Sequence, residues 1–266
     1  MRILKLSSDK YNNSLMSNMK DGIKIKKTTG AVIVLIIIGI FAIGILVGVT
    51  IGKNTSKEKD NETSKPLGYE EEVTDIENSY NGTYPKDKII MYGSSSFRLW
   101  TTMSEDLAPL EVLNHGFGGA SLDDAINYAD RLVVAFKPKA VVIYCGTNDL
   151  GGLADGSIKD AKAAYEVSVA LINYIKDKLP NTKVYYVASS PQPLRWNRWG
   201  EISICNKYMK EYCKSNEDVT YIDTEDVLLD KDGNYYPEYY LEDGLHFSEK
   251  GYKVWGEVIK DCLTKD

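Results

Sequence analysis

The side chains best suited to chemistry in this 266-residue chain are a serine hydroxyl and one of its two histidines. Three serines, residues 94–96, follow the short apolar run 89–92, and Gly93 separates the run from the serines. A serine hydroxyl is a weak nucleophile until a neighbouring base takes its proton. His246 is a candidate base, because Asp243 stands three residues before it and can fix its tautomer on a tight turn. These features favour nucleophilic chemistry by an activated serine.

Alternating strand and helix patterns predict the elements that position these side chains. Strands are expected at 88–92, 111–114, 140–145, 183–187 and 219–222, and helices at 69–80, 121–136, 157–179, 201–214 and 248–263. Such alternation implies an α/β fold in which helices cover both faces of a parallel sheet. Ser121 with Asp124, and Ser157 with Asp160, have the spacing of N-terminal helix caps.

Ligands bind such a sheet beyond the carboxyl ends of its strands. The segments expected there are the serines 94–96, the glycine-rich segment 114–121 and the segment 145–149, while residues 243–246 precede the last helix. Each segment alone is explained better as a turn or a helix cap. Together they supply a nucleophile, a base and backbone N–H donors at one edge, which are the parts that acyl transfer needs. His115 lacks a carboxylate partner at such a spacing, so we expect it to be structural.

Four blocks of the sequence resemble, in the same order, the motifs of the SGNH (GDSL-type) hydrolases. They are Gly93-Ser94-Ser95, Asn114 to Gly119, Gly146-Thr147-Asn148-Asp149, and Asp243 to His246. The resemblance covers roughly residues 85–262. It implies a flavodoxin-like three-layer α/β/α sandwich around a five-stranded parallel sheet, and the chemistry calls for no metal or organic cofactor.

The resemblance also implies a role for five residues. The nucleophile falls on Ser95, the base on His246 and the acid on Asp243, while the backbones of Ser95 and Gly119 and the Asn148 side chain donate to the oxyanion.

The sequence departs from the family pattern at one position. The family usually has aspartate before the nucleophile, where this chain has Ser94. Serine-rich versions occur among these esterases, so the departure is compatible with activity. It leaves the choice among Ser94, Ser95 and Ser96 to rest on register alone.

The expected activity is hydrolysis of a short acyl ester, most simply acetyl, on a small molecule or a carbohydrate. An O-acyltransferase with the same triad and an inactive surface-binding module are the alternatives. Trp196 and Trp199 follow the fourth expected strand, and their faces would either stack on a sugar or acyl chain or simply cover the domain.

The start of the chain has the pattern of a membrane anchor. Residues 31–51 are uncharged and apolar, long enough to cross about 30 Å of hydrocarbon at about 1.5 Å per residue. Basic residues predominate in residues 1–30, which places them in the cytoplasm. We expect a cytoplasmic tail at 1–30, a single uncleaved transmembrane helix at 31–51, a flexible stalk at 52–68 and an extracytoplasmic domain at 69–266. A cleaved signal peptide is the alternative, but residues 50–53 form a poor cleavage site.

Charge and cysteine spacing argue against a nucleic-acid-binding protein and against a zinc site. The chain carries 32 basic and 38 acidic side chains, and its basic excess lies in the tail, so the acidic remainder is a poor binder of nucleic acid. Cys205 and Cys213 lie about 12 Å apart on one expected helix and cannot bridge each other. No cysteine spacing resembles a zinc site, and we expect Cys145, Cys205, Cys213 and Cys262 to be buried thiols.

Overall fold

The computed structural model describes residues 68–265, which fold around one parallel sheet. The cytoplasmic tail predicted at 1–30, the transmembrane helix predicted at 31–51 and all but the last residue of the stalk predicted at 52–68 lie outside the described residues. No helix within residues 68–265 combines the length and apolar character needed to span a membrane.

Five parallel strands form the sheet in the order β2-β1-β3-β4-β5. They are β1 (Ile89–Gly93), β2 (Val112–Gly116), β3 (Ala140–Tyr144), β4 (Lys183–Val187) and β5 (Val219–Ile222). The predicted five-stranded parallel sheet is therefore confirmed. The chain passes from β1 to β2 on one side and then crosses to β3 on the other, so the topological switch point lies at the carboxyl ends of β1 and β3.

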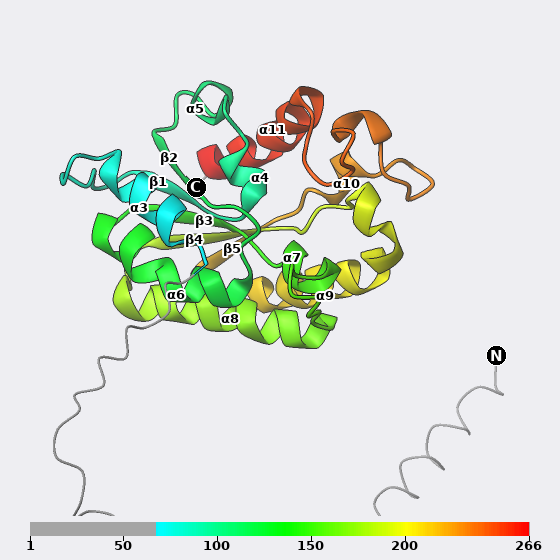
Figure 1. The fold of residues 1–266 in the computed structure, drawn as a ribbon, viewed down its shortest axis with the longest axis horizontal. Coiled ribbons are helices and arrows are strands. Elements are labelled where there is room, and N and C mark those ends of the chain that lie inside the picture. The colour runs from blue at the N-terminus through cyan, green and yellow to red at the C-terminus, as the bar shows by residue number, and fades with distance from the viewer. Residues whose placement is uncertain (1–67, 266) are drawn as a thin grey trace, which may run out of the picture. The chain divides into compact units, whose positions relative to one another are not determined.

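Helices cover both faces of the sheet, as Figure 1 shows. One core cluster joins the sheet to α3 (Glu70–Asn78), α6 (Leu122–Leu132), α8 (Ala161–Lys178) and α9 (Trp199–Lys214). A second cluster on the other face includes residues of α4 (Ser95–Arg98), α5 (Met103–Asp106), α10 (Glu225–Leu228) and α11 (Glu249–Lys265). Successive strand residues alternate between the clusters, with Ile90 in the first and Met91 in the second. These elements make three layers, as predicted.

Short helices complete the carboxyl edge of the sheet. They are α7 (Thr147–Gly151) and the 3-10 turns η2 (Pro193–Arg198) and η3 (Pro237–Tyr239). The helix expected at 121–136 ends earlier, at Leu132, and a separate 3-10 turn, η1 (Val134–Phe136), follows it.

One of the two predicted helix caps is confirmed and one is wrong. Ser121 Oγ accepts from the Asp124 N–H at 3.1 Å, and Asp124 accepts from the Ser121 N–H at 2.9 Å. Helix α8 instead begins at Ala161, and Asp160 is its N-cap. Aspartate caps a helix as well as serine does, so the Ser157 spacing could not decide the start.

Burial of the cysteines is confirmed for three of the four. Cys145, Cys205 and Cys213 are buried, whereas Cys262 on α11 is half-buried. Cys205 and Cys213 both lie on α9 and form no disulfide with each other. Burial raises the pKa of Cys205 to about 12, so this thiol stays protonated at neutral pH.

His115 is fully buried in β2 and contacts α6 and the segment that follows α3. Its Nδ1 lies 2.6 Å from the Leu132 carbonyl, and its Nε2 lies 2.9 Å from the Tyr80 hydroxyl. A neutral ring satisfies both contacts by donating from Nδ1 and accepting at Nε2. Burial lowers the pKa of His115 to about 4, which fits the predicted structural role.

We predict that His115 makes stability depend on pH between about 6.5 and 4. The folded pKa of about 4 lies below the unfolded value of about 6.5. The unfolded state therefore binds the proton more readily in this window, and the free energy of unfolding falls as the pH falls. His115→Gln removes this contribution. Urea titrations should show that the difference in the free energy of unfolding between wild type and variant shrinks by about 3 kcal/mol from pH 7 to pH 4. A difference that does not change with pH would contradict the lowered pKa of His115.

Candidate active site

Ser95 begins helix α4 directly beyond β1, because Gly93 lets the chain turn there. The φ angle of Gly93 is 148°, and a Cβ atom at this position would lie 2.0 Å from the Tyr144 carbonyl oxygen on β3. Only glycine tolerates both this backbone and this contact. Ser94 is the extended N-cap residue of α4, and Ser95 is its first helical residue. The turn holds Ser95 at the carboxyl edge of the sheet.

Three side chains from two distant segments form a continuous hydrogen-bonded series. Ser95 Oγ lies 2.9 Å from His246 Nε2, and His246 Nδ1 lies 2.7 Å from Asp243 Oδ2. With the Nδ1 proton directed at the carboxylate, Nε2 can accept the serine proton. The structure therefore brings together the three side chains that the sequence singled out.

The segment carrying His246 is folded tightly around the Asp243 carboxylate. Asp243 Oδ1 accepts from the backbone N–H groups of Leu245 and His246 at 2.8 and 3.0 Å. Although partial burial opposes it, hydrogen bonding from His246 and Leu245 lowers the pKa of Asp243. Leu194 N–H also donates to the Gly244 carbonyl at 2.9 Å, which ties this segment to η2. The carboxylate therefore remains charged and can stabilise an imidazolium at His246.

Contacts within residues 68–265 distinguish the three serines. His246 Nε2 has its hydrogen bond with Ser95 and has none with Ser94 or Ser96 in this part of the chain. Ser94 is 1% exposed and Ser96 is 2% exposed, while Ser95 is 9% exposed. The Tyr252 hydroxyl of α11 donates to the Ser96 carbonyl at 2.8 Å, which fixes α4 beside α11. Ser95 is thus the serine in register with His246.

The segments after β2 and β3 meet through Asn148. Its Nδ2 donates to the Ala120 carbonyl at 2.9 Å, directly after Gly119. Its Oδ1 accepts from Arg195 at 2.8 Å. Two of the three residues expected to supply oxyanion donors, Gly119 and Asn148, therefore belong to segments in direct contact.

Asp149, the last residue of the Gly146–Asp149 block, links helices. Its side chain is fully buried and accepts from the Leu122 N–H at 3.0 Å and from Lys159 Nζ at 2.9 Å. Burial raises the pKa of Asp149 against the opposing effect of these bonds. Although burial opposes it, hydrogen bonds to Asp123 and Asp149 raise the pKa of Lys159 to about 12. We assign Asp149 to holding α7 against the start of α6.

Helix α3 supports the glycine-rich segment, a contact that the sequence did not predict. The Gly118 N–H donates to Glu72 Oε2 at 2.7 Å, and the rings of Tyr69 and Phe117 lie 5.4 Å apart. Arg131 of α6 binds both Glu70 and Glu77 of this helix. Three acidic residues in the first turn of a leading helix were the only sequence signal, and they did not identify the partner.

Trp196 and Trp199 lie half-buried in and after η2, with their rings stacked at 6.0 Å. Trp196 also meets the ring of Tyr235 at 4.9 Å, and Trp199 packs against the first core cluster. Both tryptophans therefore cover part of the domain while keeping some exposed surface. A role in stacking on substrate stays a prediction.

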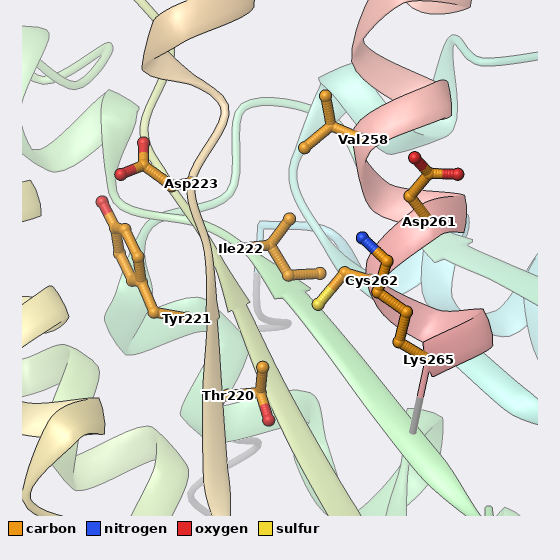
Figure 2. A pocket seen from close by; sticks show the side chains of 8 residues that line it. All are labelled: Thr220, Tyr221, Ile222, Asp223, Val258, Asp261, Cys262 and Lys265. Atoms are coloured by element: carbon orange, nitrogen blue, oxygen red, sulfur yellow. The ribbon is translucent and has the colours of Figure 1, made fainter.

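A surface cavity of about 330 Å³ lies between β5 and α11, as Figure 2 shows. It is lined by Thr220, Tyr221, Ile222, Asp223, Val258, Asp261, Cys262 and Lys265. None of these belongs to the series formed by Ser95, His246 and Asp243. Within residues 68–265, no group of three or more His, Cys, Asp and Glu side chains is arranged to hold a metal ion.

Comparison with known proteins identifies relatives of this chain. The model of the GDSL-like Lipase/Acylhydrolase family matches residues 86–254. N-acylneuraminate cytidylyltransferase of Escherichia coli O18:K1:H7 (strain RS218 / NMEC) is 30% identical over 179 residues, which are 66% of this chain and 40% of that protein. The chain thus spans about 40% of the length of this curated relative.

Solved structures share the fold at low sequence identity. A GDSL-like lipase from Bacteroides thetaiotaomicron VPI-5482 has a TM-score of 0.62 and 17% identity, with 73% of this chain and 97% of that chain covered. A family 3 carbohydrate esterase from Clostridium thermocellum has a TM-score of 0.52 and 18% identity, with 67% and 99% covered. These similarities show a common fold.

We predict that Ser95 and His246 act as one unit. Ser95→Ala and His246→Ala should each lower kcat for p-nitrophenyl acetate about 10⁴-fold or more, and the double variant should be little worse, since triad losses are not additive. Ser94→Ala is the matched control and should retain substantial activity. An inactive Ser94→Ala beside an active Ser95→Ala would show that the register is wrong.

Proposed function

Since this chain belongs to the GDSL-like lipase/acylhydrolase family and is a serine hydrolase acting on esters, we propose that Ser95, His246 and Asp243 are its catalytic triad. The observation that carries the proposal is the unbroken hydrogen-bonded series from Ser95 Oγ through His246 to Asp243. Membership of an enzyme family argues against the inactive surface-binding module, which fluorophosphonate labelling tests.

In the proposed mechanism, Ser95 Oγ attacks the ester carbonyl carbon while His246 Nε2 takes the hydroxyl proton. The carbonyl oxygen becomes an oxyanion that accepts from the backbone N–H groups of Ser95 and Gly119 and from Asn148 Nδ2. Loss of one such donor typically lowers the rate about 10²–10³-fold. When the carbon–oxygen bond breaks, His246 returns the proton to the leaving alcohol and an acyl-enzyme remains.

The second half of the reaction uses the same groups with water in place of the alcohol. His246 takes a proton from water, which attacks the acyl carbon of the ester on Ser95. Collapse of the new tetrahedral intermediate restores the Ser95 hydroxyl and releases the carboxylic acid. The charged Asp243 stabilises the imidazolium in both halves, in keeping with the lowered pKa of Asp243.

The proposed substrate is a short acyl ester, most simply acetyl, on a carbohydrate. The fold is shared with a carbohydrate esterase, and the name of the curated relative contains a sugar, N-acylneuraminate. The partly exposed rings of Trp196 and Trp199 offer flat faces that suit a sugar. These observations support a sugar-borne ester over a long fatty acyl ester.

The proposal includes an extracytoplasmic location at the cell membrane. It rests on the basic residues 1–30 beside the apolar run 31–51. Protease added to intact cells would then release the domain by cutting within residues 53–65; protection until lysis would refute this orientation.

We predict that catalytic efficiency falls as the acyl chain lengthens. An enzyme that buries a long acyl chain gains roughly 0.8 kcal/mol per methylene, so its efficiency rises steeply along a series of esters. For this enzyme, kcat/KM should be highest for the acetyl and propionyl p-nitrophenyl esters and should fall by the octanoyl ester. Trp196→Ala should raise KM for an acetylated oligosaccharide more than for p-nitrophenyl acetate. A preference for octanoyl or longer esters would contradict the carbohydrate proposal and leave the triad intact.

A further inference from the structure

The guanidinium of Arg195 connects Asn148 to the segment that carries His246. Its Nη2 donates to Asn148 Oδ1 at 2.8 Å, and its Nη1 donates to Gln192 Oε1 at 2.9 Å. Gln192 is 2% exposed, and its Nε2 donates to the Leu245 carbonyl at 3.1 Å. A single series of hydrogen bonds therefore runs from Asn148 to the residue preceding His246.

Arg195 determines which end of the Asn148 amide faces which neighbour. An asparagine amide has an accepting oxygen at one end and a donating nitrogen at the other, whereas a guanidinium can only donate. Asn148 Oδ1 must therefore face Arg195. Nδ2 then donates one proton to the Ala120 carbonyl and keeps a second proton for another acceptor. In the proposed mechanism that acceptor is the oxyanion.

The positive charge of Arg195 also acts on this amide. Within residues 68–265, the side-chain acceptors bonded to the Arg195 guanidinium are two neutral amides, and Asp149 acts on it through its charge without a hydrogen bond. A charged donor at Oδ1 draws electron density from the amide, which makes the Nδ2 protons stronger donors. Burial lowers the pKa of Arg195, against the opposing charge effects of Tyr144 and Asp149.

Gly151 leaves the space that Arg195 occupies. A Cβ atom on Gly151 would lie 2.1 Å from Arg195 Cδ and 2.2 Å from its Nε. Since Gly151 ends helix α7 and Asn148 is in that helix, the same element supplies both the amide and the room for the guanidinium. The contact between Arg195 and Asn148 therefore also depends on the absence of a side chain at Gly151.

We propose that Arg195 is a positioning residue that orients and polarises the oxyanion-binding amide of Asn148. The inference rests on the proposed function, because it assumes that Asn148 Nδ2 donates to the oxyanion. Arg195 acts through Asn148 and need not touch the substrate.

Arg198 provides a matched control on the same segment. Its Nε donates to the Leu150 carbonyl at 3.0 Å and its Nη2 to the Lys159 carbonyl at 3.4 Å, so it binds backbone near α7 without binding the Asn148 side chain. Arg198→Met removes the same charge and a similar volume three residues away in η2. It should leave kcat for p-nitrophenyl acetate within about threefold of wild type, a span of less than 1 kcal/mol.

A double-mutant cycle on p-nitrophenyl acetate tests the proposal. Arg195→Met should lower kcat about 10- to 100-fold with KM within twofold, and Asn148→Ala should lower kcat about 10²–10³-fold. In the Asn148→Ala background, Arg195→Met should cost less than threefold, because the amide on which it acts is absent. Arg195→Lys keeps a charged donor and should recover part of the loss. Thermal unfolding of each variant confirms that the domain is folded.

Three results would overturn the proposal. Losses that multiply in the double variant would show that Arg195 acts independently of Asn148. A higher KM with unchanged kcat, or a loss confined to esters bearing a carboxylate, would show that Arg195 binds substrate instead. If Arg195→Met does not fold, Gly151→Ala tests the same contact by displacing the guanidinium, and wild-type kcat in that variant would refute the inference. Failure of the proposed function is distinct, since Ser95→Ala would then remain active.

Discussion

The hydrogen bond between Ser95 Oγ and His246 Nε2 joins residues 151 positions apart, and the surrounding structure holds its two ends together. At one end, Gly93 allows β1 to turn against β3, so that Ser95 begins α4 at the edge of the sheet. At the other end, Asp243 accepts hydrogen bonds from the backbone and the ring of His246. A proton transfer tolerates little change in such a distance. The site therefore depends on the rigidity of both supports.

Aromatic packing between α4 and α11 supplies that rigidity. The rings of Phe97 and Trp255 lie 5.5 Å apart, and those of Trp100 and Trp255 lie 5.4 Å apart. Tyr252 adds a hydrogen bond to the Ser96 carbonyl. Since α4 begins at Ser95 and α11 follows His246, this part of the core fixes the nucleophile relative to the base. Large aromatic rings suit the task because each makes many contacts with few rotatable bonds.

The sequence predicted the elements, and the proximity of Ser95, His246 and Asp243, better than it predicted the other contacts between elements. Each strand was recognisable as a short strand-like run between helical segments. The Ser121 cap was recognisable because both of its partners lie within four residues. The cap at Ser157 was wrong because Asp160 competes for the same local role. Arg195 was missed because its contact with Asn148 crosses 47 positions and follows no periodic pattern. The same reason explains why the support of Gly118 by Glu72 was not foreseen.

Covalent labelling tests most directly whether His246 activates one serine of the three. A fluorophosphonate reacts with a serine whose proton a neighbouring base removes. Labelling of the wild-type protein, followed by peptide mapping with mass spectrometry, should place the adduct on Ser95, and His246→Ala should label far more slowly. An adduct on Ser94 or Ser96, or labelling of Ser95 that is unchanged in His246→Ala, would contradict activation of Ser95 by His246.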